Sequence, residues 1–225
     1  MAAKINEEQM QTILSTLYKK SLNGIPKVSI PAQDLANDYL QKNHNSPDEA
    51  TKSLIRYQIA KCGTSGFLTG LGGLITLPIT IPANVSSVLY VQMRMIAAIA
   101  CLGGFDPHSD QVQTLVYLCL TGSSINEIIT KTGIVIGEKL TLSLVEKIPG
   151  KVLIKINQMV GFRLLTKMGT KGVINFVKLV PVVGGVIGGT MDIVSTKAIA
   201  ANAYNIFIKK TMSETPSLET VCPEA

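Results

Sequence analysis

Residues 66–105 decide the fold, and they read GFLTGLGGLITLPITIPANVSSVLYVQMRMIAAIACLGGF. Arg94 is the only charged residue in this stretch. Pro82 suits the first turn of a helix, and Gly103 with Gly104 suits its end, so the pattern predicts one long helix over residues 83–102. Such a helix is apolar nearly all round, and helices of that kind lie inside a protein core or in a membrane.

A membrane span is the alternative for this stretch, because residues 66–93 are uncharged for long enough to cross ~30 Å of hydrocarbon. Pro78 and Pro82 interrupt the run, and its glycine, threonine and serine residues make a poor lipid-facing surface. A broken helix is tolerated in a membrane only where protein covers its free backbone groups. We therefore expect a soluble core, with membrane insertion as the alternative. The β-branched residues 74–81 also permit a strand, but the helical flanks favour helix and turn.

A second stretch, residues 177–208, repeats the outline of the first: VKLVPVVGGVIGGTMDIVSTKAIAANAYNIFI. Glycines four apart remove side chains from one helix face and let two backbones approach closely. This spacing predicts tight helix packing at Gly66, Gly70, Gly184, Gly185, Gly188 and Gly189. Neither stretch has the spacing of a phosphate-binding loop, which disfavours nucleotide binding. The fold class that follows is all-α, a compact multi-helix bundle with two glycine-rich apolar helical hairpins packed centrally.

Start and stop signals place the remaining helices. Asn6 with Gln9, and Ser46 followed by Pro47 and Glu49, are capping signatures. We expect helices at 7–22, 31–41, 47–62, 111–120, 124–146 with an interruption near Gly133, 151–167, 170–179 and 181–209. With 225 residues the chain suits one helical domain over 1–210, and the acidic, proline-containing segment 211–225 is expected to be disordered.

Arg94 needs a partner, because an unpaired buried charge is very costly. Asp192 is the only acidic residue between Glu146 and Glu214, and it lies in the second apolar stretch. We therefore predict an Arg94–Asp192 ion pair between the two long helices. It is either purely structural or part of a functional cavity. The candidate residues of this cavity are Arg94, Asp192, Asn84, Gln92, Ser195 and Thr196.

The positive charge is concentrated in one region. The net charge is +6, yet no acidic residue occurs from Lys147 to Met191. Basic residues alternate there with apolar ones in a helical pattern, which is typical of helices that bind membrane surfaces. The predicted contacts with anionic lipid are Lys151, Lys155, Arg163, Lys167 and Lys171. The alternative is an ordinary solvated face, and the scarcity of interleaved aromatic residues disfavours nucleic acid.

The sequence shows no catalytic or metal-binding signature. GxSxG, HExxH and carboxylate clusters are absent, and His44 and His108 fall in predicted polar turns. The four cysteines have no paired spacing, so free thiols in a reducing compartment are expected. The polar N-terminus lacks the apolar core of a signal peptide. We expect no cofactor and no metal, and enzymatic activity is left open with non-enzymatic function favoured.

Several of these motifs together resemble the bacterial EcsC family. They are TGLGGLITLPITIP, then YVQMRMIAAIA, LGGFDP and QTLVYLCLTG, and later VPVVGGVIGGTMD. The resemblance covers about residues 45–210 and leaves an N-terminal helical extension over 1–44. It implies a bacterial helical protein that is cytoplasmic or associated with the inner face of the membrane. It implies no catalytic residue.

Three functions remain open at this point. The first is a non-enzymatic helical protein on the cytoplasmic face of the inner membrane, accessory to a transport or secretion complex. The second is a small-molecule or lipid-binding protein, or an enzyme, that uses a cavity near Arg94 and Asp192. The third is a protein that inserts its glycine-rich segments into the membrane.

Overall fold

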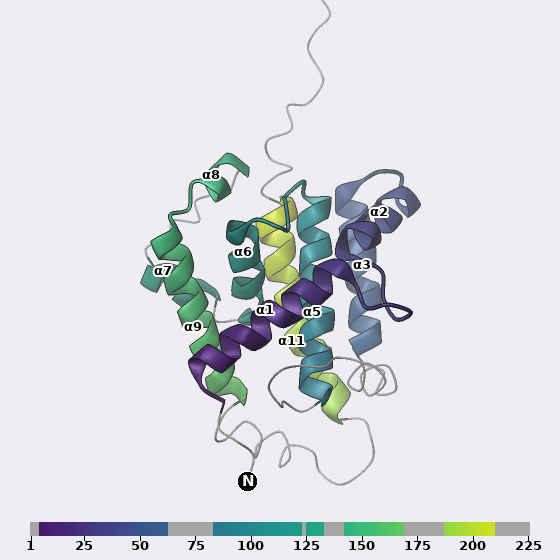
Figure 1. The fold of residues 1–225 in the computed structure, drawn as a ribbon. Coiled ribbons are helices and arrows are strands. Elements are labelled where there is room, and N and C mark those ends of the chain that lie inside the picture. Colours follow the sequence, from purple (N-terminus) through teal and green to yellow (C-terminus); the bar gives the residue numbers. More distant parts are fainter. Residues whose placement is uncertain (1–4, 63–82, 123–124, 133–141, 169–186, 210–225) are drawn as a thin grey trace, which may run out of the picture.

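The computed structural model describes residues 5–62, 83–122, 125–132, 142–168 and 187–209 (Figure 1). Within these ranges the chain is helical, apart from turns and one isolated bridge between Ile25 and Ser29. The all-α prediction is therefore confirmed. The elements are α1 (Glu7–Asn23), α2 (Ala32–Lys42), α3 (Pro47–Cys62), α5 (Ala83–Leu102), α6 (Asp110–Leu120), α7 (Ile125–Thr132), α8 (Leu142–Glu146), α9 (Gly150–Met168), α11 (Ile187–Tyr204) and the π-helical turn η2 (Asn205–Lys209).

Local capping explains where the first helices begin. The Asn6 side chain accepts a hydrogen bond from the Gln9 amide at 2.8 Å, and the Gln9 side chain accepts one from the Asn6 amide at 2.9 Å. This reciprocal pair is the predicted capping box, and it satisfies two amides that the helix itself leaves unpaired. Ser109 caps α6 with a single hydrogen bond, which its side chain accepts from the Val112 amide.

The helix α5 forms the centre of the bundle. It packs against α1, α2, α3, α6 and α11, and α1 crosses it on one face (Figure 1). Its segment Val85–Leu102 is long and apolar enough to span a membrane, but 78% of that segment is buried inside the fold. In this structure α5 thus has the position of a core helix, enclosed by protein.

The end of α5 is fixed to the end of the last helix. The η2 turn buries Ile206, Phe207 and Ile208, and the Phe207 ring meets Phe105 edge-on with centroids 5.2 Å apart. A Cβ added to Gly103 would collide with the backbone carbonyl of Phe207. The backbones of α5 and η2 are therefore in direct contact, and this contact requires a glycine.

Some boundaries differ from the prediction, and some predicted segments lie outside the described residues. The expected helix over 124–146, with its interruption near Gly133, corresponds to α7, which ends at Thr132, and α8, which begins at Leu142, while residues 133–141 lie outside the described ranges. The π-helical turn at the end of α11 was not predicted. The glycine-rich segments 63–82 and 169–186, with the expected helix 170–179, lie outside the described ranges. So does the predicted tail 211–225.

The buried pair Tyr18 and Tyr117 leads to a prediction about alkaline pH. Tyr18 donates a hydrogen bond of 2.5 Å to the Pro107 carbonyl and meets Tyr117 edge-on. Burial raises the pKa of Tyr18, and it raises the pKa of Tyr117 to about 12. These phenols ionise near pH 10 in the unfolded chain only, so their contribution to stability is complete below pH ~10 and is lost as pH rises through the folded-state pKa.

We expect the free energy of unfolding to fall above pH ~10, with each tyrosine contributing up to ~1.4 kcal/mol per pH unit. Tyr18→Phe should reduce that slope by the contribution of one ionising group, up to ~1.4 kcal/mol per pH unit. At neutral pH it should also cost ~1–3 kcal/mol, because the Pro107 carbonyl loses its hydrogen bond. Urea unfolding of both proteins between pH 9 and 11 measures the difference. Equal slopes would mean that Tyr18 is not protected from ionisation.

Candidate functional site

The helix α9 carries the described part of the basic segment, and its buried face explains its orientation. Leu153, Ile156, Val160 and Leu164 are buried and recur every three or four residues. This is the spacing of one helix face, and α9 packs with it against α1, α6 and α7. The opposite face of α9 is therefore turned to solvent.

That outward face combines apolar and basic side chains. The α9 outward face is defined by the exposed residues Lys151, Ile154, Lys155, Gln158 and Phe162, which fall on one side of the helix. Ile154 is 60% exposed and Phe162 is 56% exposed, the two largest values among the exposed large apolar side chains of the described residues. No acidic residue occurs within α9. The α9 outward face is thus both apolar and positively charged.

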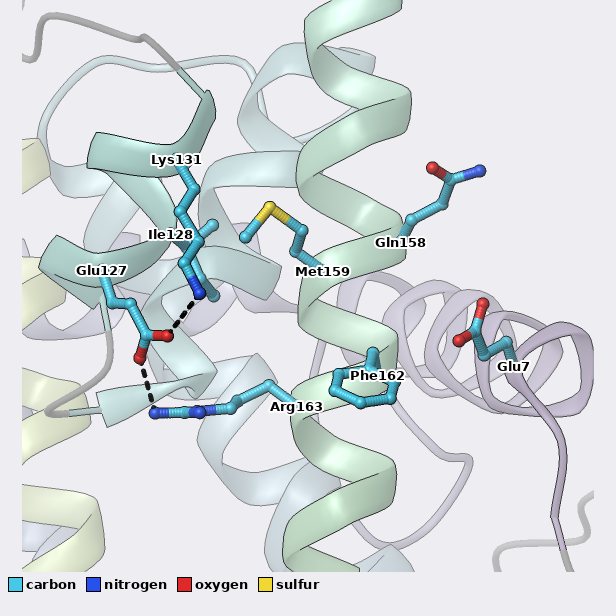
Figure 2. A pocket seen from close by; sticks show the side chains of 8 residues that line it. All are labelled: Glu7, Glu127, Ile128, Lys131, Gln158, Met159, Phe162 and Arg163. Atoms are coloured by element: carbon cyan, nitrogen blue, oxygen red, sulfur yellow. Dashed lines mark hydrogen bonds and ion pairs between the residues drawn. The ribbon is translucent and has the colours of Figure 1, made fainter.

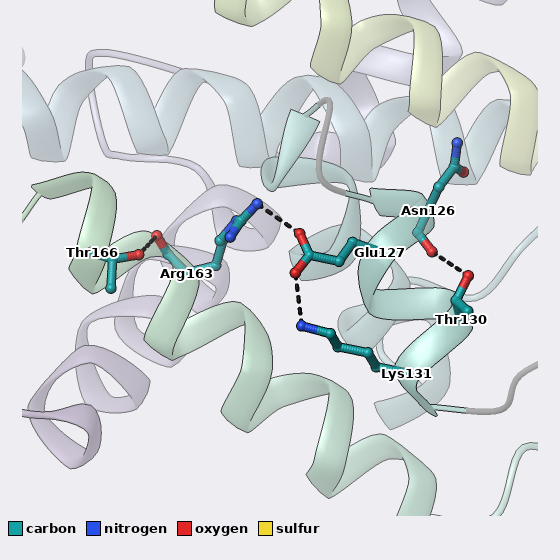
Figure 3. A network of polar contacts seen from close by, with 6 residues as sticks. All are labelled: Asn126, Glu127, Thr130, Lys131, Arg163 and Thr166. Atoms are coloured by element: carbon teal, nitrogen blue, oxygen red, sulfur yellow. Dashed lines mark hydrogen bonds and ion pairs between the residues drawn. The ribbon is translucent and has the colours of Figure 1, made fainter.

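Arg163, predicted as a lipid contact, is paired within the protein. Its guanidinium lies 2.8 Å from one carboxylate oxygen of Glu127, whose other oxygen lies 2.8 Å from the Lys131 ammonium (Figure 3). The hydrogen bond from Lys131 and the charge of Arg163 hold the pKa of Glu127 below its usual value. The carboxylate thus joins α7 to α9, and a charge already paired with it is a weak candidate for lipid binding.

The other predicted lipid contacts differ in their surroundings. Lys151 is exposed. Lys155 is exposed as well, and its ammonium donates a hydrogen bond of 2.9 Å to the Lys131 carbonyl at the end of α7. The side chain of Lys167, and Lys171 as a whole, lie outside the described part of the chain. The structure therefore leaves Lys151 and Lys155 as the basic residues to test.

A hollow of about 410 Å³ adjoins this face, between α1, α7 and α9. Figure 2 shows Glu127, Lys131 and Arg163 on one side of α9, with Gln158 and Glu7 on the other. Ile128, Met159 and Phe162 supply its apolar walls. The exposed Phe162 ring thus belongs to a larger surface that is partly apolar.

Arg94 lies on the far side of the bundle from α9, and a backbone group is its partner. Arg94 is 8% exposed, and its Nε donates a hydrogen bond of 2.9 Å to the Ile30 carbonyl. Burial lowers the pKa of Arg94, while the neighbouring Tyr90 and Tyr39 act in the opposite direction. Within the described residues this is the only hydrogen bond of the guanidinium. Arg94 also lines a cavity of about 450 Å³ between α2, α3, α5 and the turn before α2.

The predicted cavity residues are divided between two faces of α5. Gln92 donates a hydrogen bond of 3.1 Å to Thr196 on α11, and both side chains are buried. Arg94 follows Gln92 by two positions, which is about 200° around a helix, so it faces α2 instead of α11. Ser195 is exposed. The side chains of Asn84 and Asp192 lie outside the described residues, and the Arg94–Asp192 pair stays a prediction.

The glycines that the structure shows in close contact are not the predicted ones. Gly66, Gly70, Gly184 and Gly185 lie outside the described ranges. Gly188 and Gly189 belong to α11, but their surroundings are not described. A Cβ on Gly161 would instead meet the Gln11 side chain of α1 at 2.5 Å. A glycine inside a helix costs ~1 kcal/mol relative to alanine, so its position in α9 was a usable signal of close packing.

Comparison with known protein families, with curated proteins and with solved structures finds no match for this chain. Among the described residues, no group of three or more His, Cys, Asp or Glu side chains is placed to hold a metal ion. Fold and sites define an all-α protein with an apolar, basic helix face and a separate cavity around a buried arginine. The EcsC resemblance stays a prediction.

Proposed function

We propose that this protein binds peripherally to an anionic membrane surface through the α9 outward face. The observation that supports this is the alignment of two exposed large apolar side chains, Ile154 and Phe162, with Lys151 and Lys155. Single exposed apolar residues are ordinary on protein surfaces. Two of them in one stripe with two lysines, on a helix without acidic residues, match the surface of an interfacial helix.

The two kinds of side chain contribute to binding in different ways. Each lysine near an anionic surface adds ~1 kcal/mol, while its aliphatic stem lies along apolar surface and its ammonium reaches the headgroups. Transfer of the Phe162 ring and the Ile154 side chain from water into the lipid boundary lowers the free energy of the bound state. Binding therefore requires acidic lipid and also an accessible acyl boundary, which distinguishes it from simple adsorption of a positive protein.

The position of α5 favours a peripheral protein over a spanning one, because its most apolar segment already packs against five other helices. A role beside a transport or secretion complex of the inner membrane remains part of the proposal through the EcsC resemblance. The contacts of such a complex would involve other surfaces, since the α9 outward face is assigned to lipid.

Cosedimentation with lipid vesicles tests the proposal. We expect the full chain to bind vesicles containing phosphatidylglycerol and not vesicles of phosphatidylcholine alone. Binding should weaken with salt, because the Debye length shrinks from ~10 Å at 0.1 M to ~3 Å at 1 M ionic strength. Equal binding to neutral and acidic vesicles would overturn the electrostatic part of the proposal, and no binding to either would overturn all of it.

Changing Lys151 and Lys155 to glutamine should weaken binding to acidic vesicles about 10- to 30-fold. Arg163 is left intact, because its loss would break the ion pair to Glu127. The matched control changes Lys52 and Arg56, which are also exposed and four apart but lie on α3. This control removes two positive charges, as the Lys151 and Lys155 variant does. Losing the surface ion pair of Lys52 with Asp48 should cost little stability. Equal weakening by both variants would show that only net charge matters.

A further inference from the structure

The cavity around Arg94 is separate from α9 and is built from α2, α3, α5 and the turn Ile25–Ile30. Arg94, Gln58 and Tyr90 supply buried polar groups to it. Ile30, 47% exposed, and Tyr57, 50% exposed, supply apolar surface at its mouth. The cavity therefore combines polar and apolar walls, and its volume of about 450 Å³ lies within the size range of small-molecule sites.

Two of the buried polar groups retain unused hydrogen-bonding capacity. The Arg94 guanidinium has five N–H donors, and the Ile30 carbonyl uses the one on Nε. Gln58 is 2% exposed, lines the same cavity, and its amide has no hydrogen-bond partner among the described residues. In the described residues the fully buried side-chain atoms without a partner belong to Thr51 and Asn157, so the unbonded groups of Arg94 and Gln58 are open to the cavity, where they can pair with a polar ligand group.

The charges of the cavity select the sign of that group. Its cationic residues are Arg94, Lys42 and Lys61, and its acidic residue is Asp38. Asp38 is already bound to Lys42 at 2.7 Å, so that pair is neutral as a unit. Lys61 lies over the Tyr57 ring at 4.7 Å from its centroid. Arg94 makes no ion pair with a described residue, and its planar guanidinium is suited to the two oxygens of an oxyanion.

We infer that this cavity binds a small organic oxyanion, a carboxylate or phosphate on an apolar body. The oxyanion accepts hydrogen bonds from the terminal nitrogens of Arg94 and from the Gln58 amide. The apolar body lies against Tyr57, Tyr39 and Ile30. This site involves no residue of α9, so it stands or falls independently of membrane binding.

Four probes test separately the need for a negative charge, the kind of anionic group and the need for an apolar body. They are phenylacetate, its neutral analogue phenylacetamide, phenyl phosphate and inorganic phosphate. We expect phenylacetate or phenyl phosphate to bind the full chain saturably, with a dissociation constant on the order of 1 mM or below by calorimetry. Phenylacetamide should bind at least ~10-fold more weakly, because it lacks the charge. Whichever of phenylacetate and phenyl phosphate binds more tightly shows whether the cavity prefers a carboxylate or a phosphate. No saturable binding of either, or equal binding of phenylacetamide, would overturn the inference, and so would inorganic phosphate binding as tightly as both.

Two variants locate the site. Gln58→Glu keeps the side-chain size and adds a negative charge to the cavity that Arg94 lines, so anion binding should fall about 10- to 100-fold. Arg94→Lys keeps a charge but loses the planar fork, so it should also weaken binding. The control Arg56→Met removes an exposed arginine from α3, the helix that carries Gln58. Arg56 lies outside this cavity, so this variant should bind the anion as the wild type does. Gln58→Glu protein that melts normally and still binds at full strength would refute the assignment.

Discussion

Replacing Gly103 with valine is expected to lower the melting temperature by ~10 °C or more, or to prevent folding altogether. The added Cβ would overlap the backbone carbonyl of Phe207, and no rotamer change relieves a clash with backbone. Either the end of α5 or the η2 turn has to move, and both belong to the buried core. A cost of ~3–5 kcal/mol is a large part of the ~5–15 kcal/mol that stabilises a typical domain.

Circular dichroism melts of Gly103→Val and Gly150→Ala measure this effect. Gly150 is the matched control, because nothing lies within 4 Å of the position of its added Cβ. The control should melt within a few degrees of the wild type. If Gly103→Val also melted there, the direct contact between α5 and η2 would be wrong.

Changing Ile154 and Phe162 together to serine is expected to weaken binding to acidic vesicles about 100-fold or more. Full burial of a large apolar side chain is worth ~1.5–3 kcal/mol, and the two side chains contribute independently when both enter the lipid boundary. The fold should be preserved, because both side chains are more than half exposed. Vesicle cosedimentation with an accompanying thermal melt separates the two effects.

The matched control changes Val28 and Tyr57 to serine, since these are also exposed apolar residues but lie beside the Arg94 cavity. Vesicle binding of this control should equal that of the wild type. Retained binding by the Ile154 and Phe162 variant would leave only electrostatic adsorption, and the α9 outward face would lose its assigned role.

Local signals carried most of the fold prediction. The capping box at Asn6, the serine cap at Ser46 and the glycine stop at Gly103 act within a few residues, so they are visible in the sequence. The long apolar run 83–102 predicted the central helix for the same reason. Features that depend on tertiary contacts are harder to predict from the sequence. The π-helical turn at residues 205–209 is an example, because no local sequence pattern marks it.

The candidate sites show the same limit. Burial of Arg94 is predictable from the apolar helix around it, but its partner is the Ile30 carbonyl, which lies 64 positions away and which no acidic side chain marks in the sequence. The partner of Arg163 is Glu127, 36 positions away, and nothing in the helical spacing of α9 indicates it. Ile154 and Phe162 did leave a signal, because they lie off the apolar stripe of Ile156, Val160 and Leu164. An apolar residue outside the buried stripe of its helix is a candidate for binding.

The most direct test of the membrane proposal uses the absence of tryptophan from the chain. Phe162→Trp places a single tryptophan, excited selectively at long wavelength, on the α9 outward face, and Tyr57→Trp places one beside the Arg94 cavity as a control. With phosphatidylglycerol vesicles, we predict a blue shift and quenching by shallowly brominated lipid for position 162, since interfacial helices sit ~5–10 Å into the headgroup and acyl boundary. Position 57 should not change. An unshifted spectrum at 162 on vesicles that carry the bound protein, or equal shifts at both positions, would contradict the account.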